Sequence, residues 1–164
     1  MTRFYAGVGS RQTPPDILSR MKTIAQDLSR KGWVLRSGGA EGADTAFEIG
    51  AGSKKEIFLP WKGFNGNDSG FHNPTLGAYK LAESVIPWWG TMSDGAKKLH
   101  ARNAHQVFGW TLKEPVEFVL CWTQGGEPKG GTRTAIVLAH QANIPVINLW
   151  RDKFNYSEFD LVEF

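Results

Sequence analysis

Runs of apolar residues alternate along the chain with stretches in which apolar positions recur at helical spacing. Five runs rich in β-branched and other apolar residues predict strands, at residues 3–8, 33–36, 56–59, 117–122 and 146–149. The stretches between them predict helices, at residues 14–31, 42–50, 93–111 and around 136–139. For the first helix, Thr13 is the expected N-cap, Pro14 the first helical residue and Gly32 the end.

Strands that alternate with helices in this way favour a parallel sheet with helices on both of its faces. The predicted fold class is therefore α/β, a Rossmann-like three-layer sandwich with a mainly parallel central sheet. No linker, repeat or low-complexity tract interrupts the pattern, so residues 1–164 are interpreted as a single domain.

Two segments depart from the alternation. Residues 61–93 are rich in glycine, proline, asparagine and aromatic residues, and only one short helix, at residues 76–85, is expected there. A long segment with little regular structure is typical of a functional loop, and we interpret it as a lid-like insertion. Disorder is the alternative, against which its many aromatic residues argue. The acidic and aromatic tail at residues 150–164 is expected to form a strand or a strap packed on the body.

Glycine-rich turns follow the first, second and fourth predicted strands. In a parallel sheet such turns meet at the carboxyl edge, where ligands bind. Glycines that lead into a helix allow a phosphate to approach backbone N–H groups and the positive end of the helix dipole. A tight turn without a ligand is the alternative for each segment. The predicted phosphate-binding residues are Gly9, Ser10, Arg11, Ser37, Gly38, Gly39, Gly42, Gly130, Gly131, Thr132 and Thr134.

Other candidates lie in the helices and in the insertion. Within a predicted helix, Arg102 and Asn103 could hold a phosphate and a sugar or base edge; a surface helix with one core-facing asparagine is the alternative. Asp44 and Glu48 are four residues apart on one predicted helix face, which makes them candidate catalytic carboxylates or solvated surface charges. The candidates for stacking on a base, with core packing as the alternative, are Trp61, Trp88 and Trp89.

Composition and charge restrict the ligands, cofactors and location that this protein can be expected to have. A formal charge of +3 and a pI near 9.1 suit a phosphate-bearing ligand without requiring a nucleic acid. The single cysteine, Cys121, excludes an internal disulfide framework and fits a cytoplasmic location. With four scattered histidines and no paired cysteines, no metal site is expected, and we expect no other cofactor. No apolar run is long enough to cross a bilayer, so no membrane partner is predicted.

The chain resembles the Rossmann-like domain of the DprA/Smf proteins and the wider SLOG superfamily, which joins them to the LOG phosphoribohydrolases. The resemblance rests on four motifs in the same order: Gly-Ser-Arg at 9–11, Ser-Gly-Gly-Ala-Glu-Gly-Ala-Asp at 37–44, Arg-Asn at 102–103 and Gly-Gly-Thr-Arg-Thr-Ala at 130–135. It implies a pocket for nucleotide phosphates, often in a homodimer.

Two departures from these families bear on chemistry. LOG enzymes carry a catalytic glutamate where this chain has Ala135, and DprA-type chains carry a histidine near the position of Phe47 and Glu48. The sequence therefore leaves three hypotheses. The first is a module that binds a nucleotide, a nucleotide-derived ligand or single-stranded DNA. The second is a hydrolase of the N-glycosidic bond of nucleoside 5′-monophosphates. The third is a sensor or sponge for a nucleotide-derived signal, in a bacterium or a phage.

Overall fold

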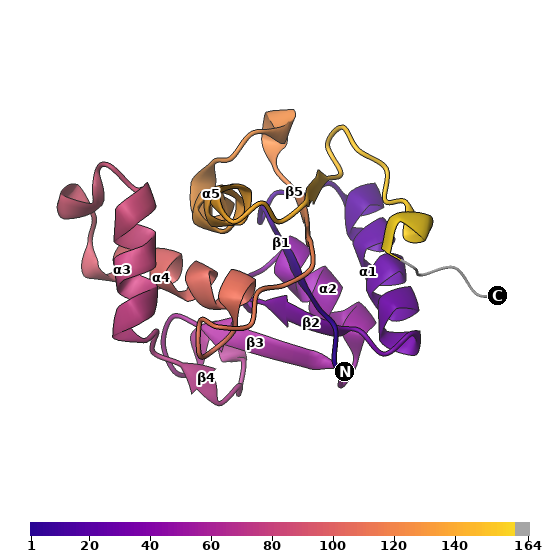
Figure 1. The fold of residues 1–164 in the computed structure, drawn as a ribbon, viewed down its shortest axis with the longest axis horizontal. Coiled ribbons are helices and arrows are strands. Elements are labelled where there is room, and N and C mark those ends of the chain that lie inside the picture. Colours follow the sequence, from indigo (N-terminus) through magenta and orange to yellow (C-terminus); the bar gives the residue numbers. More distant parts are fainter. Residues whose placement is uncertain (160–164) are drawn as a thin grey trace.

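A computed structural model of the chain describes residues 1–159 and shows an α/β sandwich built on one central sheet. All six strands are parallel, in the order β4-β3-β2-β1-β5-β6. This arrangement confirms the predicted fold class (Figure 1). The strands are β1 (Phe4–Gly9), β2 (Val34–Ser37), β3 (Lys55–Leu59), β4 (Phe71–His72), β5 (Val119–Trp122) and β6 (Val146–Asn148).

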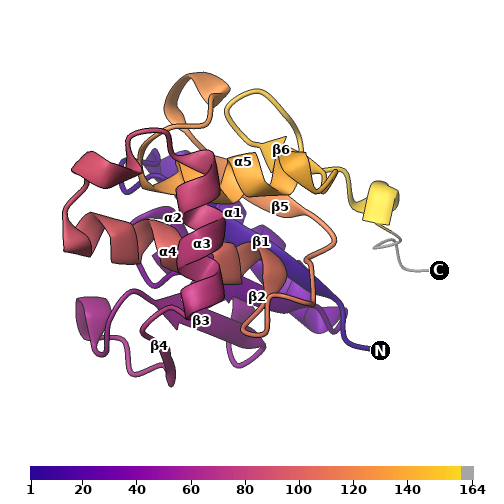
Figure 2. The ribbon, with the colours of Figure 1, turned by 60° about the vertical axis from the view of Figure 1, so that its left-hand side comes forward.

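Helices cover both faces of the sheet. The helices are α1 (Pro15–Arg30), α2 (Ala43–Ala51), α3 (Leu76–Val85), α4 (Asp94–Phe108) and α5 (Arg133–Gln141). One core cluster joins α1 and α2 to one face of the sheet, and a second joins α4 and α5 to the other. The third cluster packs α3 against α4 and α5, so that α3 lies outside these two helices (Figure 2).

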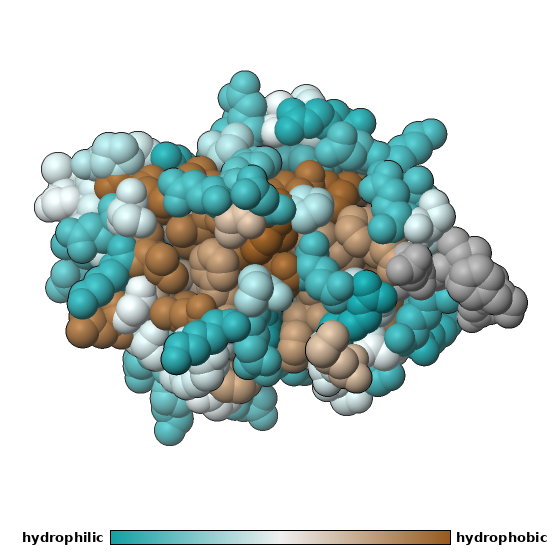
Figure 3. Space-filling model, viewed as in Figure 1, coloured by the Kyte–Doolittle hydropathy of each residue, from teal (hydrophilic) through white to brown (hydrophobic). Residues whose placement is uncertain are grey.

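The alternation of side chains along the strands explains this layering, because successive residues of a strand point to opposite faces. Along β5, Leu120 and Trp122 join the cluster with α1 and α2, whereas Val119 and Cys121 join the cluster with α4 and α5. On the outer side, apolar side chains gather where α3, α4 and α5 meet, bordered by polar side chains (Figure 3).

The first helix begins differently from the prediction. It begins at Pro15, with Pro14 at the N-cap position and no side-chain cap. The hydroxyl of Thr13 instead donates to the Ser10 carbonyl at 2.7 Å, so Thr13 stabilises the turn after β1 rather than the helix end.

Of the two irregular segments, the insertion is more regular than expected, whereas the described tail takes one of its two expected forms. Residues 61–93 contain the predicted helix α3 and also β4, which adds a strand to the edge of the sheet. Whether the segment acts as a lid stays a prediction. In the tail, Phe154 and Phe159 pack on Phe118 with ring centroids 5.5 Å and 4.2 Å away, and the Tyr156–Phe159 segment forms a 3₁₀ turn. The tail up to Phe159 is thus a strap and not a strand; residues 160–164 lie outside the described part.

Among the described residues, no helix combines the length and the apolar character that crossing a membrane would require.

Candidate functional site

A cavity of about 720 Å³ opens at the carboxyl edge of the sheet. The chain passes from β1 to β2 on one side and returns to β5 on the other, so the strand order reverses between β1 and β5. In open parallel sheets this reversal leaves a crevice in which ligands bind. Here the turns after β1, β2 and β5 and one side of α4 form its walls, and we call it the crevice.

The structure brings many of the sequence-predicted residues to this crevice. Those that line it are Gly9, Ser10, Arg11, Asp44, Arg102, Asn103, Gly130, Gly131 and Thr132. Those that do not line it are Ser37, Gly38, Gly39, Gly42, Glu48, Thr134, Trp61, Trp88 and Trp89.

Arg102 and Asn103 use their polar groups mainly on the protein itself. The guanidinium of Arg102 donates to the carbonyl of Gly38, in the turn after β2, and to the side chain of Asn103 at 3.0 Å. The amide of Asn103 donates to the carbonyl of Gly131, in the turn after β5, at 2.6 Å. Both side chains are buried. The Arg-Asn pair therefore ties two of the glycine turns to α4 and to each other.

The turn after β2 is packed against its neighbours without free space. A Cβ atom at Gly38 would lie 2.6 Å from the Arg102 guanidinium, and one at Gly42 would lie 2.7 Å from the Arg11 Cα atom. Gly42 also has a φ of +80°, which other residues rarely adopt. The hydroxyl of Ser37 donates to the Gly7 carbonyl at 2.6 Å. These glycines allow close packing between turns.

The turn after β5 has the opposite character. A Cβ atom at Gly130 or Gly131 would meet no atom within 4 Å, and both residues are exposed, as is Lys129. The turn leads through a 3₁₀ segment, Gly130–Thr132, directly into α5. The first N–H groups of a helical run lack partners within it and are suited to an anion. This turn offers the crevice both room and hydrogen-bond donors.

Asp44 lies at the start of α2 and is 3% exposed. Its carboxylate accepts a hydrogen bond from the Ala40 N–H at 3.2 Å. Burial raises the pKa of Asp44 to about 6, while the charge of Arg102 and the Ala40 hydrogen bond act in the opposite direction. The crevice wall therefore contains a carboxyl group that changes its charge near neutral pH.

His100, on α4, is another titratable group of the crevice with an altered pKa. Burial lowers its pKa, and the positive charges of Arg102 and Arg133 lower it further. Its Nδ1 atom lies 2.8 Å from the hydroxyl of Thr134, which is buried in α5. Thr134 is thus engaged with α4 rather than open to a ligand.

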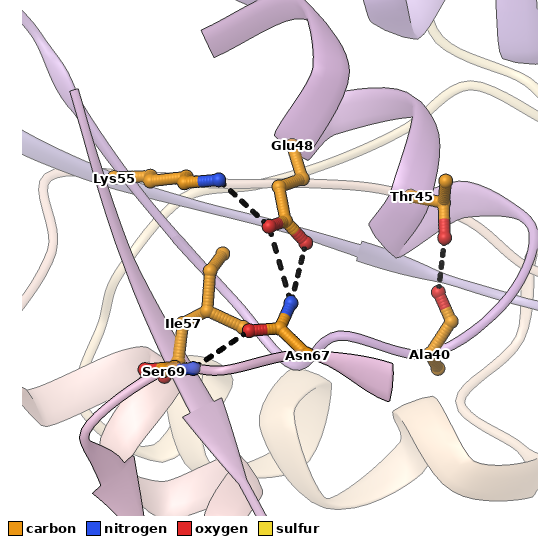
Figure 4. A network of polar contacts seen from close by, with 7 residues as sticks. All are labelled: Ala40, Thr45, Glu48, Lys55, Ile57, Asn67 and Ser69. Carbon is orange, nitrogen blue, oxygen red and sulfur yellow. Dashed lines mark hydrogen bonds and ion pairs between the residues drawn. The ribbon is translucent and has the colours of Figure 1, made fainter. Parts of the chain in front are cut away.

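The proposed pairing of Asp44 with Glu48 is not formed in the crevice. Glu48 lies one turn further along α2 and opens onto a separate cavity of about 460 Å³. Its carboxylate binds Lys55 Nζ at 2.8 Å and the Asn67 amide at 3.1 Å, and Figure 4 shows both converging on it. The i, i+4 spacing placed both carboxylates on one helix face, but β3 and the 61–70 loop hold Glu48 away from Asp44.

The three tryptophan candidates have different surroundings. Trp61 is 38% exposed and packs edge-to-face on Phe64, which itself lines the crevice. Trp88 is exposed, and the guanidinium of Arg133 lies over its ring, with the Arg133 Cζ atom 4.8 Å from the ring centroid. Trp89 packs in the cluster between α3 and α4. Within residues 1–159, Trp61 is the one of the three that packs on an aromatic residue of the crevice.

Sequence reasoning missed several residues of the crevice. Lys129 adjoins a recognised glycine motif, so its position was a usable signal. Side chains that reach the crevice from α4 or from the 61–70 loop gave no local signal, because tertiary packing alone brings them there. The missed lining residues with polar or aromatic side chains are Gln12, Glu41, Phe64, His100, Gln106, Thr123, Gln124 and Lys129.

No protein-family model matches the chain. No curated protein matches it in sequence. Solved structures with a similar fold do exist. One is DNA processing protein A from Helicobacter pylori, which is described for its single-stranded DNA binding mode. The match has a TM-score of 0.59 and 18% sequence identity, and it covers 98% of this chain and 74% of the H. pylori chain.

Another is DNA processing protein A (DprA) from Streptococcus pneumoniae, with a TM-score of 0.50 and 14% identity. That match covers 90% of this chain and half of the pneumococcal one. These likenesses show a DprA-like fold.

Proposed function

We propose that this chain binds single-stranded DNA through its phosphate backbone, in the crevice between β1 and β5. The observation that carries the proposal is the open, exposed turn at residues 129–131 within a crevice at the carboxyl edge of the sheet. The H. pylori protein of similar fold is described as binding single-stranded DNA, which supports this choice of ligand. In this proposal the chain is a DprA-like domain of the SLOG superfamily.

Charge supports a phosphate ligand. Exposed Arg11 and Lys129 lie on two walls of the crevice, contributed by the turns after β1 and β5. The first N–H groups of the 3₁₀ run at Gly130 and Gly131 lie beside Lys129. Guanidinium, ammonium and backbone N–H groups are the usual partners of phosphate oxygens.

An aromatic surface lies beside these charges. Phe64 lines the crevice, and Trp61 packs on Phe64 with its ring centroid 5.2 Å away. Proteins that bind single strands without sequence preference combine such a positive groove with aromatic side chains on which bases stack. We assign Trp61 and Phe64 to base stacking.

Salt-dependent binding tests the proposal. Fluorescence anisotropy with a labelled oligothymidylate of 12 nucleotides should show affinity falling steeply between 50 and 200 mM salt, as counterions return to the phosphates. Because each phosphate contact contributes about 0.7 to the slope, Arg11→Ala and Lys129→Ala should each lower it by roughly that amount. Lys80→Ala on α3, outside the crevice, should leave it unchanged.

Two results would contradict the proposal. One is an oligonucleotide affinity that is independent of salt and strand length. The other is saturation of the crevice by a single nucleotide that prevents oligonucleotide binding at high affinity, which would favour the small-ligand sensor.

A second candidate function is hydrolysis of the N-glycosidic bond of a nucleoside 5′-monophosphate. Asp44 favours it, because a buried carboxyl group with a pKa near 6 on a crevice wall suits a general acid or base. Against it stand the position of Glu48 in the other cavity and Ala135 in place of the LOG glutamate. Release of free base from any nucleoside monophosphate, abolished by Asp44→Asn, would establish this function.

A further inference from the structure

The turn that follows β6 lies beside the turn that follows β5. Both leave the carboxyl edge of the sheet, and Figures 1 and 2 show the two segments next to each other at the top of the molecule. The turn after β5 forms a wall of the crevice, whereas none of the residues described after β6, up to Phe159, lines it. The β6 turn is therefore the adjacent surface over which a strand leaving the crevice would pass.

Asn148 fixes these two turns to each other. Its amide group donates to the Thr123 hydroxyl at 2.7 Å, and its side-chain oxygen accepts from the N–H groups of Thr123 and Trp150, at 3.3 Å and 3.1 Å. Its own N–H donates to the Asp152 carboxylate at 3.0 Å. Thr123 lines the crevice, so one buried asparagine links the crevice wall to the backbone of Trp150.

Trp150 is presented to solvent on this support. Its side chain is 50% exposed, although one part of it packs on Trp122 with ring centroids 5.7 Å apart. Its Cδ1 atom also lies against Gly126, in the turn after β5, where a Cβ atom would approach it to 3.0 Å. An indole that is held by packing contacts and still half exposed offers a surface on which a base can stack without further ordering.

Positive charge flanks this indole. Arg151 and Lys153 are exposed, and the Arg151 guanidinium lies against Gly126, as Trp150 does. The acidic residue between them, Asp152, is engaged by the N–H of Asn148. An exposed tryptophan with a neighbouring arginine matches the needs of one nucleotide, a π-face for the base and a cation for the phosphate.

We propose that Trp150 and Arg151 form a second nucleotide subsite, reached by a single strand as it leaves the crevice past Gly126. The base stacks on Trp150, and Arg151 contacts the backbone. This inference rests on the proposed binding of single-stranded DNA and extends it, because it makes the bound length greater than the crevice alone accommodates.

A length series of oligothymidylates, from 2 to 12 nucleotides, tests this subsite by anisotropy at fixed salt. For the longer strands, Trp150→Ala should weaken binding about tenfold, a factor that corresponds to ~1.4 kcal/mol and lies within the range for one stacked base. For the shortest strands it should change nothing. Trp150→Phe should retain most of the affinity, because a phenyl ring still stacks.

Trp88→Ala is the matched control, since Trp88 is 51% exposed but packs on Arg133 and does not line the crevice. It should leave binding at every length unchanged, and thermal melting should show all variants folded. Equal loss of affinity at all lengths, or no loss from Trp150→Ala while the wild type binds long strands, would overturn the subsite. Failure of the wild type to bind any strand would instead overturn the proposed function itself.

Discussion

The turns after β2 and after β5 are both rich in glycine and both lead into a helix, yet their surroundings differ. In the first, Gly38 and Gly42 are in contact with Arg102 and with the backbone of Arg11. In the second, Gly130 and Gly131 face open space. A glycine-rich turn at the carboxyl edge of a sheet is therefore not by itself a phosphate site. The surroundings of each glycine decide whether it allows packing or binding.

The Arg102-Asn103 pair explains how the two turns depend on each other. Arg102 holds the packed turn through Gly38, and Asn103 holds the open turn through Gly131. Both glycine contacts are made to carbonyl oxygens, so the N–H groups of the open turn are not used by this pair. Through this pair, the packed turn is tied to the accessible one.

Among the variants that test this comparison of the two turns, Gly42→Ala should have the largest effect. The new Cβ atom would lie 2.7 Å from the Arg11 Cα atom, and a φ of +80° is strained for alanine. We expect a loss of about 2 to 5 kcal/mol in the free energy of unfolding, measured by urea denaturation. Gly131→Ala is the control: its unfolding should be nearly unchanged, while its affinity for oligothymidylate falls about tenfold. Equal stability of the two variants would contradict the assigned difference.

Arg102→Met should produce the next largest effect. It leaves the carbonyls of Gly38 and Phe58 without a guanidinium donor and removes the positive charge near Asp44. The expected destabilisation is about 3 kcal/mol, again by urea denaturation. Adding Asp44→Asn should recover part of this lost stability, because the second substitution removes the buried carboxylate that Arg102→Met leaves without a neighbouring positive charge. Strictly additive losses in the double variant would argue against coupling between the two side chains.

Lowering the pH should strengthen the binding of oligothymidylate in the crevice. The pKa of Asp44 is raised to about 6, so its carboxyl group is ionised at pH 7.5 and mostly neutral at pH 5.5. Losing this negative charge favours a phosphate ligand, and we expect roughly threefold tighter oligothymidylate binding at pH 5.5. His100, whose pKa is lowered, gains its charge only at lower pH and acts in the same direction. Asp44→Asn should flatten the dependence; an unchanged profile in that variant would exclude Asp44 as its source.

Glu48→Gln should have the smallest effect. Its ion pair with Lys55 is partly exposed, so we expect a loss of about 0.5 to 1 kcal/mol in stability. Oligothymidylate affinity should be unchanged, because Glu48 opens onto the other cavity. A tenfold change in affinity would mean that this cavity takes part in binding.

The fold could be predicted well from the sequence because apolar residues recur at helical or strand spacing in most of its helices and strands. Helix α3 was placed correctly inside an otherwise irregular segment. Strand β4, at Phe71–His72, was missed because two residues carry no alternation that could reveal a strand. The N-cap assignment of Thr13 was wrong because its hydroxyl has a competing partner in the β1 turn, the carbonyl of Ser10.

The position of the candidate crevice could be predicted from topology, whereas the direction of its side chains could not. The carboxyl ends of parallel strands share one edge, so turns far apart in sequence could be placed together. Which way Arg102 points, or which neighbour engages Glu48, depends on residues from other elements, such as Gly38 and Asn67. No local pattern encodes those contacts.

The most direct test of the central claim is a titration of the isotopically labelled protein with oligothymidylate, followed by amide chemical shifts in NMR. The account predicts the largest changes at Gly130 and Gly131, with much smaller ones at Gly38 and Gly42 in the packed turn. Changes centred on Gly66 and Asn67, beside the second cavity, or no changes at a saturating strand concentration, would contradict it.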